Sequence, residues 1–468
     1  AQVAILAQAI FCSRQCNLGS FETPLRPAQG SMQRACCLVV LCASTAVAED
    51  PAWTVLERLF SAVSIGIGFT DDSTGWTSHT DGSSLPQIVR TTDGGKTWKN
   101  VTSTTGVPLS IVTGVAAARS ATQGSSRDAE PFEDAVKDAA FTAVATAGVL
   151  ESEKWSLDGL HFSQSLGAPL TAQDVKFQAG RAVLAGPSGP CLSSTAGALY
   201  ACKRVPLKYN QTGRYASAPS KDVIYFTAGQ WPRDGDGAGP VPHGDGTSHV
   251  HVTRNLRVHY GQSGRVQRVE VGAQRSSFGR HTGKKSPGYT AELWKSTDGG
   301  ETWRNLITDE GAFYFNDIHC IDETHCVAVG EGFAEDNSTS PGARVYTTSD
   351  GETFKLAHTE SAKGTESLLA ARMLSATEHW AGGTTKAGGL LAPALLLHSK
   401  DAGKTYANEN HGLVGLMVTA LDFLSPEHAY ATAVNAAQLC SILEYAAPAP
   451  LSPLARPGEA PALADVVV

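Results

Sequence analysis

An apolar stretch followed by a polar, glycine-containing turn recurs along the middle of the chain. The clearest copies are Gln87–Arg90 followed by Thr91–Trp98, and Glu292–Lys295 followed by Ser296–Trp303. Asp-Gly and Gly-Gly pairs supply the positive φ angles that tight hairpins need. The pattern therefore predicts antiparallel strand pairs joined by one kind of turn.

The turn has a sequence of its own, S/T-x-D-x-G-x-T-W, and we call each copy of it a box. Its hydroxyl and carboxylate groups can accept hydrogen bonds from backbone N–H groups of the turn, and its closing aromatic residue begins the next strand. An active site is a single constellation, whereas a structural turn recurs with the fold, so we interpret the repeated aspartates as structural and not catalytic. The predicted pairs of carboxylate and aromatic residue are Asp93 and Trp98, Asp158 and Phe162, Asp298 and Trp303, Asp350 and Phe354, and Asp401 and Tyr406.

Copies of the turn begin at residues 91, 156, 210, 296, 348 and 399, and the copy at Asn210–Tyr215 is degenerate. A strand, polar turn and strand precede the turns, as in Phe69–Trp76 and Met373–Trp380. Together the two patterns describe a four-stranded antiparallel unit of about 50 residues, which is typical of a propeller blade. The long interval after residue 210 implies an insertion of roughly 35 residues, which we place at Gly229–Gly264.

The two ends of the repeat region complement each other. Val418–Tyr445 contains inner strands but no box, while Ala52–Val55 reads as an outer strand with Trp53 where a box aromatic would stand. Six boxed units and one unit closed by the N-terminal strand make an all-β, seven-bladed β-propeller over residues 52–445. Such closure removes exposed sheet edges.

This arrangement resembles the Asp-box (BNR-type) β-propellers over roughly the same residues. It is most similar to the photosystem II stability/assembly factor family, in the stretches Ala52–Trp76 and Ile88–Thr102. The resemblance implies a lumenal, non-enzymatic chaperone that acts on a newly made reaction-centre subunit. The insertion, the cysteine pairs and an Ala/Pro-rich tail depart from that family.

Composition narrows the classes of partner. The chain has 468 residues, 45 of them acidic and 37 basic, and its formal net charge of −8 argues against a nucleic-acid binder. Charged residues make up only 18%, and 47 glycines with 3 methionines fit a turn-rich β protein. No apolar run is long enough for a transmembrane helix. We expect a protein partner, such as a membrane complex contacted peripherally, and no cofactor.

The alternative function is a secreted propeller that binds or hydrolyses glycans. Sialidases are the best-known enzymes with these boxes, and they resemble one another in three clustered arginines, an Arg-Ile-Pro type motif and a Tyr/Glu nucleophile pair. The sequence contains no Arg-Ile-Pro, and its arginines are scattered. Carboxylates from distant blades can converge, however, so the alternative stays open.

The segment Met32–Ala48 has a short basic start, an apolar middle and a small-x-small end, which predicts a secretory signal peptide. Residues 1–31 stay unassigned. We expect a secreted protein, or one that is targeted onward to a plastid or thylakoid lumen. The tail Ala446–Val468 is rich in Ala and Pro and is expected to be disordered.

Five cysteines follow this segment. The short spacings of Cys191 to Cys202 and of Cys320 to Cys326 predict two hairpin-scale disulfides in an oxidising compartment, with Cys440 as a thiol. A zinc site would need four ligands at CxxC-like spacing, and none is present.

The candidate metal ligands lie in the insertion. His249 and His251 would share one face of a strand, although a solvated polar loop is the simpler interpretation of this composition. Other potential ligands nearby are His243, His259, Asp234, Asp236 and Asp245.

Overall fold

A computed structural model gives the fold of the chain. The structure describes residues 51–59, 66–80, 86–101, 111–119, 140–147, 154–156, 158, 160–169, 172–207, 211–230, 256–260, 266–271, 290–310, 313–331, 342–360, 366–385, 391–435 and 439–446. The predicted signal segment, His243, His249 and His251 of the insertion, and residues 447–468 of the tail lie outside these residues. Ala446 is the last residue of a strand.

The described strands form seven four-stranded antiparallel sheets and one two-stranded ribbon. We number the first six large sheets as blades in chain order. Blade 1 contains β2 (Ile67–Phe69), β3 (Gly75–Thr80), β4 (Pro86–Thr91) and β5 (Lys99–Asn100). Blade 2 contains β6 (Ile111–Arg119), β7 (Ala140–Ala147), β8 (Lys154–Ser156) and β9 (Ser163–Gln164). Blade 3 contains β10 (Val175–Gln178), β11 (Arg181–Gly186), β12 (Gly189–Ser193) and β13 (Ala201–Cys202).

The remaining large sheets follow the same order from the inner to the outer strand. Blade 4 contains β14 (Thr212–Ser217), β15 (Ile224–Gln230), β18 (Thr290–Ser296) and β19 (Arg304–Glu310). Blade 5 contains β20 (Tyr314–Cys320), β21 (Cys326–Glu331), β22 (Ala343–Thr348) and β23 (Lys355–Glu360). Blade 6 contains β24 (Ser367–Met373), β25 (His379–Thr384), β26 (Ala394–Ser399) and β27 (Ala407–Asn408). The closing blade contains β28 (Leu416–Ser425), β29 (His428–Asn435), β30 (Cys440–Ala446) and β1 (Ala52–Leu59).

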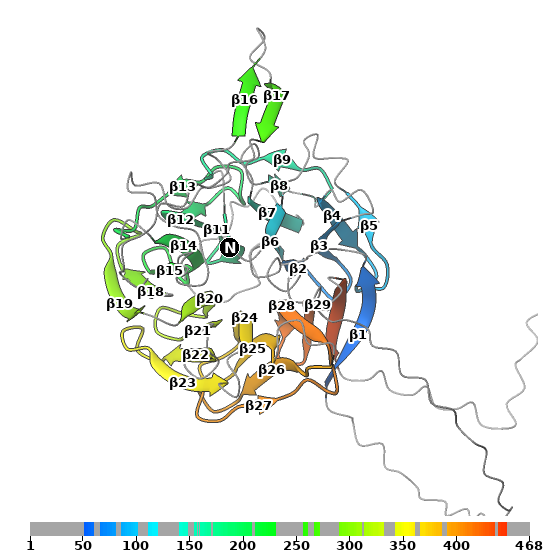
Figure 1. Cartoon of the computed structure of the whole chain (residues 1–468), viewed down its shortest axis with the longest axis vertical. Helices are drawn as coiled ribbons and strands as arrows, with labels where there is room; N and C mark the ends of the chain where they lie inside the picture. Colours follow the sequence, from blue (N-terminus) through cyan, green and yellow to red (C-terminus); the bar gives the residue numbers. More distant parts are fainter. Residues whose placement is uncertain are drawn as a thin grey trace, which may run out of the picture. The chain divides into compact units, whose positions relative to one another are not determined.

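The sheets stand around a common centre (Figure 1). Each inner strand contacts the inner strand of the next blade, and β28 of the closing blade contacts β2 of blade 1. The ring is therefore closed, and Trp53–Tyr445 forms one compact unit. The predicted propeller of four-stranded antiparallel blades is confirmed.

The closing blade joins the two ends of the repeat region, as the sequence predicts. Strand β1 pairs with β30 at the outer edge of this sheet. Trp53 is only 2% exposed, and its ring lies 5.2 Å from that of Tyr445 and 6.0 Å from that of Trp380 in blade 6. The Trp53 backbone N–H also donates to His411 Nδ1 at 3.1 Å. Burial of the indole, together with strand pairing, holds the ring shut.

Five of the seven inner strands contain a β-bulge. The register shifts by one residue in β6, β14, β20, β24 and β28. At this position Thr113 donates to the carbonyl oxygen of Ala172 at 2.7 Å, and Asn316 donates to that of Leu368 at 3.0 Å. Each acceptor belongs to the following blade. At Thr113 and Asn316 the bulge thus re-aims a side chain so that it connects two blades near the ring centre.

The interpretation of Asn210–Tyr215 as a sixth box is wrong. Most of this segment lies in β14, the inner strand of blade 4. The box turn of blade 3 is Ser193–Tyr200, in which the Ser193 hydroxyl accepts the Gly197 N–H at 3.0 Å. Thr195 stands where the other boxes have aspartate, so the sequence motif is hidden although the turn is present.

The insertion is longer than the sequence spacing indicated. It leaves blade 4 after β15 and returns at β18, so it extends well beyond the predicted Gly229–Gly264. It contains the two-stranded ribbon of β16 (Leu256–Tyr260) and β17 (Val266–Val271), and His259 lies in β16. The misplaced box had shortened the apparent interval in which the insertion falls.

Candidate functional site at the centre of the ring

The complete boxes use their carboxylates to hold the turn. In blade 4, Asp298 Oδ1 accepts the backbone N–H groups of Glu301 at 3.1 Å and Thr302 at 2.9 Å, and it also accepts the Ser296 hydroxyl at 2.7 Å. Asp298 Oδ2 accepts the Thr302 hydroxyl at 2.5 Å. These bonds, led by the one from the Thr302 hydroxyl, lower the pKa of Asp298 to about 2. The corresponding carboxylates of Asp93 and Asp401 also have their pKa lowered to about 2 by hydrogen bonds from Thr97 and Thr405.

The two shorter boxes engage their carboxylates in the same way. Asp350 Oδ1 accepts the N–H groups of Glu352 and Thr353, each at 2.8 Å, and the bond from Thr353 is the largest cause of its lowered pKa. Asp158 Oδ1 accepts the N–H groups of Leu160 and His161 at 2.8 Å. Partial burial opposes ionisation of Asp158, but hydrogen bonds led by the one from the His161 side chain lower its pKa.

The aromatic residue of each box packs under its turn or against the next strand. The Trp303 indole N–H donates to the Gly300 carbonyl at 3.1 Å, and Trp98 makes the same contact with Gly95 at 2.9 Å. The shorter boxes place Phe162 in a buried cluster and Phe354 6.0 Å from the Tyr225 ring. The Tyr406 hydroxyl bonds His379 Nε2 at 2.8 Å. Every box residue named from the sequence thus has a partner within the fold.

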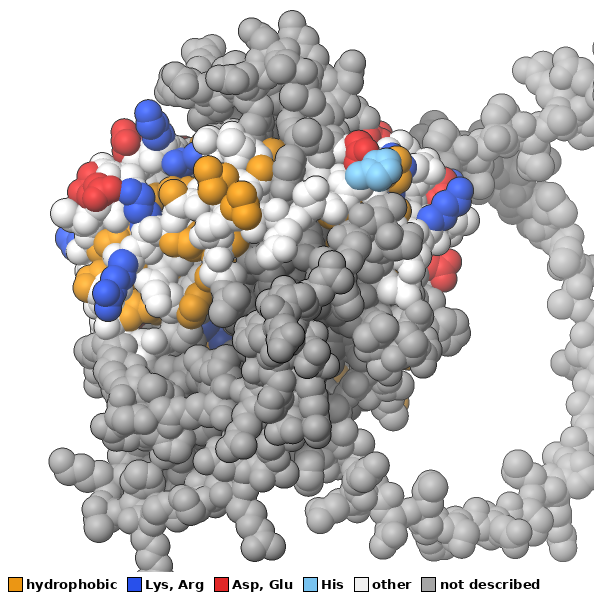
Figure 2. Space-filling model, turned by 90° about the horizontal axis from the view of Figure 1, so that it is seen from above, with side chains coloured by type: hydrophobic (Ala, Val, Ile, Leu, Met, Phe, Trp, Pro, Cys, Tyr) orange, Lys and Arg blue, Asp and Glu red, His pale blue; other side chains and the backbone are white. Residues whose placement is uncertain are grey.

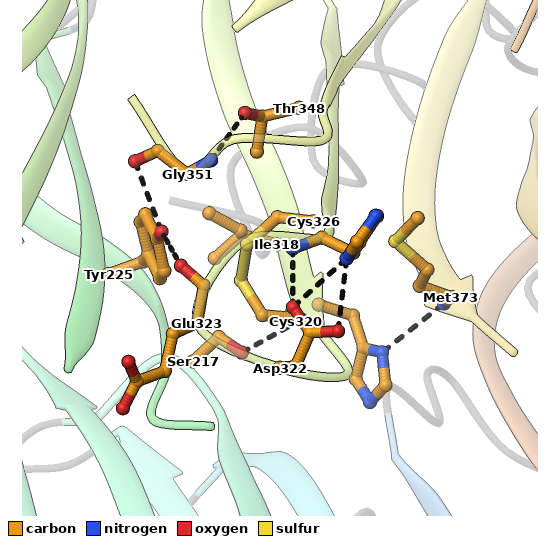
Figure 3. The surroundings of a disulfide bond; sticks show 12 residues. Ser217, Tyr225, Ile318, Cys320, Asp322, Glu323, Cys326, Thr348, Gly351 and Met373 are labelled. Atoms are coloured by element: carbon orange, nitrogen blue, oxygen red, sulfur yellow. Dashed lines mark hydrogen bonds and ion pairs between the residues drawn. A yellow bond between two sulfur atoms is a disulfide. The ribbon is translucent and has the colours of Figure 1, made fainter. Parts of the chain in front are cut away.

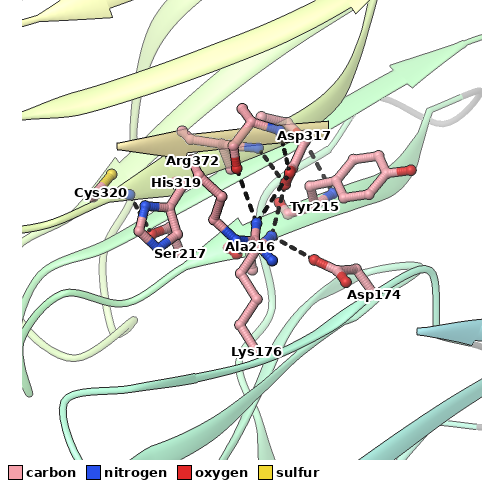
Figure 4. A network of polar contacts seen from close by, with 12 residues as sticks. Asp174, Lys176, Tyr215, Ala216, Ser217, Asp317, His319, Cys320 and Arg372 are labelled. Carbon is pink, nitrogen blue, oxygen red and sulfur yellow. Dashed lines mark hydrogen bonds and ion pairs between the residues drawn. The ribbon is translucent and has the colours of Figure 1, made fainter. Parts of the chain in front are cut away.

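A buried ionic cluster that sequence reasoning missed lies on the inner strands (Figure 4). Lys176 of β10 is hydrogen-bonded to Asp174, and its Nζ lies 2.8 Å from Asp317 Oδ1 of β20. Lys176 Nζ also donates to the Ala216 carbonyl at 3.3 Å. Arg372 of β24 approaches Asp317 Oδ2 at 3.4 Å. The cluster therefore joins blades 3, 4, 5 and 6.

Asp317 is saturated by these partners and by the backbone. Its Oδ1 accepts the Ile318 N–H and its Oδ2 accepts the Ala371 N–H, both at 2.8 Å. Burial raises the pKa of Asp174, although Lys176 opposes the shift. Burial also works against the charge on Lys176, but Asp174 and Asp317 outweigh it and raise the pKa of the amine. Two carboxylates thus stabilise one buried ammonium group.

His319, two residues beyond Asp317, and Asp422 of the closing blade also accept backbone N–H groups of the following blade. His319 Nδ1 accepts the Met373 N–H at 3.2 Å, and Asp422 Oδ2 accepts the Phe69 N–H at 2.7 Å. Burial, with Arg372 and Lys176 nearby, lowers the pKa of His319 well below its usual value, which keeps Nδ1 free to accept. Side chains of the inner strands thus link neighbouring blades at the centre of the ring.

Both predicted disulfides are confirmed. Cys191 bonds Cys202, and Cys320 bonds Cys326, each across an antiparallel strand pair. Cys440 is a buried thiol. Figure 3 shows that Tyr225 of blade 4 reaches the turn beside Cys320–Cys326. Its hydroxyl donates to the Glu323 carbonyl at 2.6 Å and contacts that of Gly351 at 3.1 Å.

The described residues contain no group of three or more His, Cys, Asp or Glu side chains that could hold a metal ion. Within the same residues, no helix is long and apolar enough to cross a membrane.

No protein-family model matches the chain, and no curated protein sequence matches it. Solved structures match the chain over most of its length at low identity. YCF48 bound to D1 peptide matches with a TM-score of 0.41 and 13% identity, over 86% of this chain and 100% of that one. The GH74 xyloglucanase from Xanthomonas campestris matches with a TM-score of 0.42 and 9% identity, over 82% and 59%. The propeller domain of the Trilobed protease from Pyrococcus furiosus matches with a TM-score of 0.42 and 10% identity, over 83% and 95%.

Proposed function

We propose that the protein is a non-enzymatic propeller scaffold that binds a partner protein in an oxidising compartment. The specific version of the proposal is an assembly factor of the photosystem II type, which rests on the sequence resemblance. The observation that carries the non-enzymatic assignment is the saturation of Asp317. Lys176, Arg372 and two backbone N–H groups occupy its oxygens, so this carboxylate holds strands of blades 3, 5 and 6 together.

One observation favours the glycan alternative. Asp174 and Asp317 converge at the ring centre near Arg372 and Tyr215, and paired carboxylates are what glycoside hydrolysis uses. Both carboxylates contact the same Lys176 ammonium, however. An ion pair of that kind holds strands together and does not position a water molecule for hydrolysis. If the pair were catalytic, Asp317→Asn would abolish turnover of a glycan while leaving the protein folded.

Exposed apolar side chains suggest where a partner binds. In an antiparallel blade, the connection from the second to the third strand and the connection to the next blade lie at the same face. Leu391, Val414 and Leu439 occupy three such connections of blade 6 and the closing blade. Leu391 is 83% exposed and Val414 is 51% exposed, and the two loops are joined by a 2.7 Å bond from the Gly415 N–H to the Ala392 carbonyl. Large apolar side chains exposed together on one face are typical of a protein-binding surface.

The experiment compares binding by two variants of the full chain. Leu391→Asp with Val414→Asp places charge on the proposed face, and Leu166→Asp with Leu199→Asp places it on the outer rim, where both leucines are also exposed. We expect the tagged protein from its native source to retain one partner in the rim variant and to lose it in the face variant. Equal binding by both variants would contradict the proposed face.

A D1 peptide tests the specific version of the proposal. Saturable binding that the face variant loses and the rim variant keeps would support an assembly-factor role. If the D1 peptide fails to bind while another protein co-purifies in a face-dependent manner, the scaffold function stands and the photosystem II version is wrong.

A further inference from the structure

The two disulfides differ in their access to solvent. Cys320 and Cys326 are both buried, whereas the Cys191–Cys202 bond has one buried end and one exposed end. Cys191 is 1% exposed and belongs to an apolar cluster with Leu184 and Tyr200. Since thiol–disulfide exchange requires an attacking thiolate to reach a sulfur atom, only Cys202 offers such access.

Among the outer strands that follow a box, the strand that carries Cys202 follows the one box without a carboxylate. Strand β13 contains only Ala201 and Cys202, which pair with Leu192 and Cys191 of β12. The box before it has Thr195 in place of aspartate. The Thr195 hydroxyl accepts the Leu199 N–H at 3.0 Å and is hydrogen-bonded to the Ser193 hydroxyl at 3.1 Å. Where Asp298 binds two backbone N–H groups and two hydroxyls, blade 3 has a neutral oxygen, so its outer edge depends more on the disulfide.

We propose that Cys191–Cys202 is a redox-controlled latch on the outer edge of blade 3, and that it is opened by dithiol reductants while Cys320–Cys326 stays closed. This site is separate from the proposed partner-binding face and does not depend on it.

The exchange proceeds in two balanced steps. A thiolate of the external dithiol attacks Cys202 Sγ, the bond to Cys191 Sγ breaks, and Cys191 leaves as a thiolate that takes up a proton in its apolar surroundings. The second thiol of the reductant then attacks the mixed disulfide, releases Cys202 as a thiolate and forms the oxidised reductant. Two electrons pass from the dithiol to the protein.

Opening the latch loosens a defined segment. The backbone of Leu166 in blade 2 holds the residues before β13, because it accepts the Tyr200 N–H at 2.8 Å and donates to Ala198 at 2.8 Å. Beyond β13, only the N–H groups of Lys203 and Val205 continue the pairing with blade 3. After reduction, the segment from Ala201 to Leu207 opens more readily, because only these two bonds, the ion pair of Lys203 with Glu301 and the burial of Val205 still hold it. The rim that carries β9 and β13 already gathers apolar side chains between charged ones (Figure 2).

The test uses the folded protein and dithiothreitol as the probe. After graded reduction without denaturant, new thiols are blocked with iodoacetamide and identified by peptide mass spectrometry. We expect Cys191 and Cys202 to appear at least about 10-fold faster than Cys320 and Cys326, because access to the sulfur controls the rate. Equal rates for the two disulfides, or reduction only in denaturant, would overturn the proposal.

Hydrogen exchange tests whether reduction of the disulfide loosens the segment from Ala201 to Leu207. Exchange of the amides from Ala201 to Leu207 should rise about 10-fold on reduction, since the cross-link no longer limits local opening. The double variant Cys191→Ser with Cys202→Ser should reproduce this rise without reductant, and Cys320→Ser with Cys326→Ser is the matched control. Reduction that leaves exchange of this segment unchanged would refute the latch, and that outcome can be read on the native protein even if a variant fails to fold.

Discussion

Blades 3 and 4 are neighbours, yet they fasten their outer strands by different means. In blade 4 the box carries Asp298, whose carboxylate binds the turn, and Trp303 packs 6.3 Å from Phe226. In blade 3 the box carries Thr195, and the Cys191–Cys202 bond crosses to the outer strand. No described residue of blade 4 is a cysteine. The carboxylate in blade 4 and the cross-strand disulfide in blade 3 therefore hold the equivalent outer edges of the two blades.

The contrast also separates the two polar positions of the box. The first hydroxyl is kept in both blades, because Ser193 accepts the Gly197 N–H at 3.0 Å and Ser296 accepts the Gly300 N–H at 2.8 Å. The aspartate is the position that can be replaced. A residue that a disulfide can replace holds structure, which supports the structural interpretation of the box carboxylates.

The largest effect should come from the closing blade, which has no box and relies on burial. Trp53→Ala removes a side chain packed against Tyr445, Trp380 and Phe423, and we expect it to lower the free energy of unfolding by about 3–5 kcal/mol. Chemical denaturation measures the loss. Removing residues 447–468 is the control and should have little effect. Equal losses in the two proteins would mean that β1 does not close the ring.

Asp298→Ala tests the box in blade 4, and we expect a smaller loss than for Trp53→Ala. The turn N–H groups that lose their acceptor are exposed, so water replaces the carboxylate in part. Thermal melts measure the effect, with Thr195→Ala in blade 3 as the matched variant. We expect Thr195→Ala to shift the melt less, because the disulfide still holds that edge. A larger shift in blade 3 would reverse the comparison.

Local patterns made most of the fold predictable. Each complete box lies within eight residues of sequence, so the sequence alone indicates the turn. The cysteines of the two disulfides also lie close in sequence, 11 and 6 residues apart. Trp53 could be placed because one unit lacked an outer strand. The turn of blade 3 escaped because Thr195 removed the residue that marks the motif.

The central cluster could not be found in the same way. Lys176 and Asp317 are 141 residues apart, and only the closed ring brings them together. Their one signal is a charged residue next to apolar ones on an inner strand, such as Lys176 between Val175 and Phe177. That signal names a residue but not its partner, because partner choice depends on the order of the blades.

Acid should weaken blade 4 and the other complete boxes but not the box of blade 3. The pKa of Asp298 falls from 3.8 to about 2 on folding, so its contribution is complete above 3.8 and is lost as the pH falls toward 2. The difference in melting temperature between the wild type and Asp298→Ala should therefore shrink toward zero near pH 2. The difference for Thr195→Ala should not change over this range. A constant difference for Asp298→Ala would mean that the carboxylate does not hold the turn.

A second titration occurs at higher pH and must be separated from that of the boxes. Burial is the main cause that lowers the pKa of His379 from 6.5 to about 4. The unfolded chain therefore binds a proton more tightly than the folded one between these values, so stability falls as the pH drops from 6.5 to 4. In His379→Gln this decline should be reduced, while the decline below pH 4 should remain. An unchanged profile above pH 4 would assign that decline to another group.

The smallest effect is the most direct test of equivalence between carboxylate and disulfide. Thr195→Asp restores the box of blade 3, and the new carboxylate can accept the N–H groups that Asp298 accepts in blade 4. We expect the free energy of unfolding to rise by about 0.5–1 kcal/mol. If the carboxylate and the disulfide secure the same edge, their contributions are coupled, so the gain should be larger after Cys191→Ser with Cys202→Ser than in the oxidised protein. Denaturant titration of the four proteins in this cycle measures the coupling. Equal gains in both backgrounds would show that the carboxylate and the disulfide act independently, and the comparison of the two blades would then describe two unrelated features.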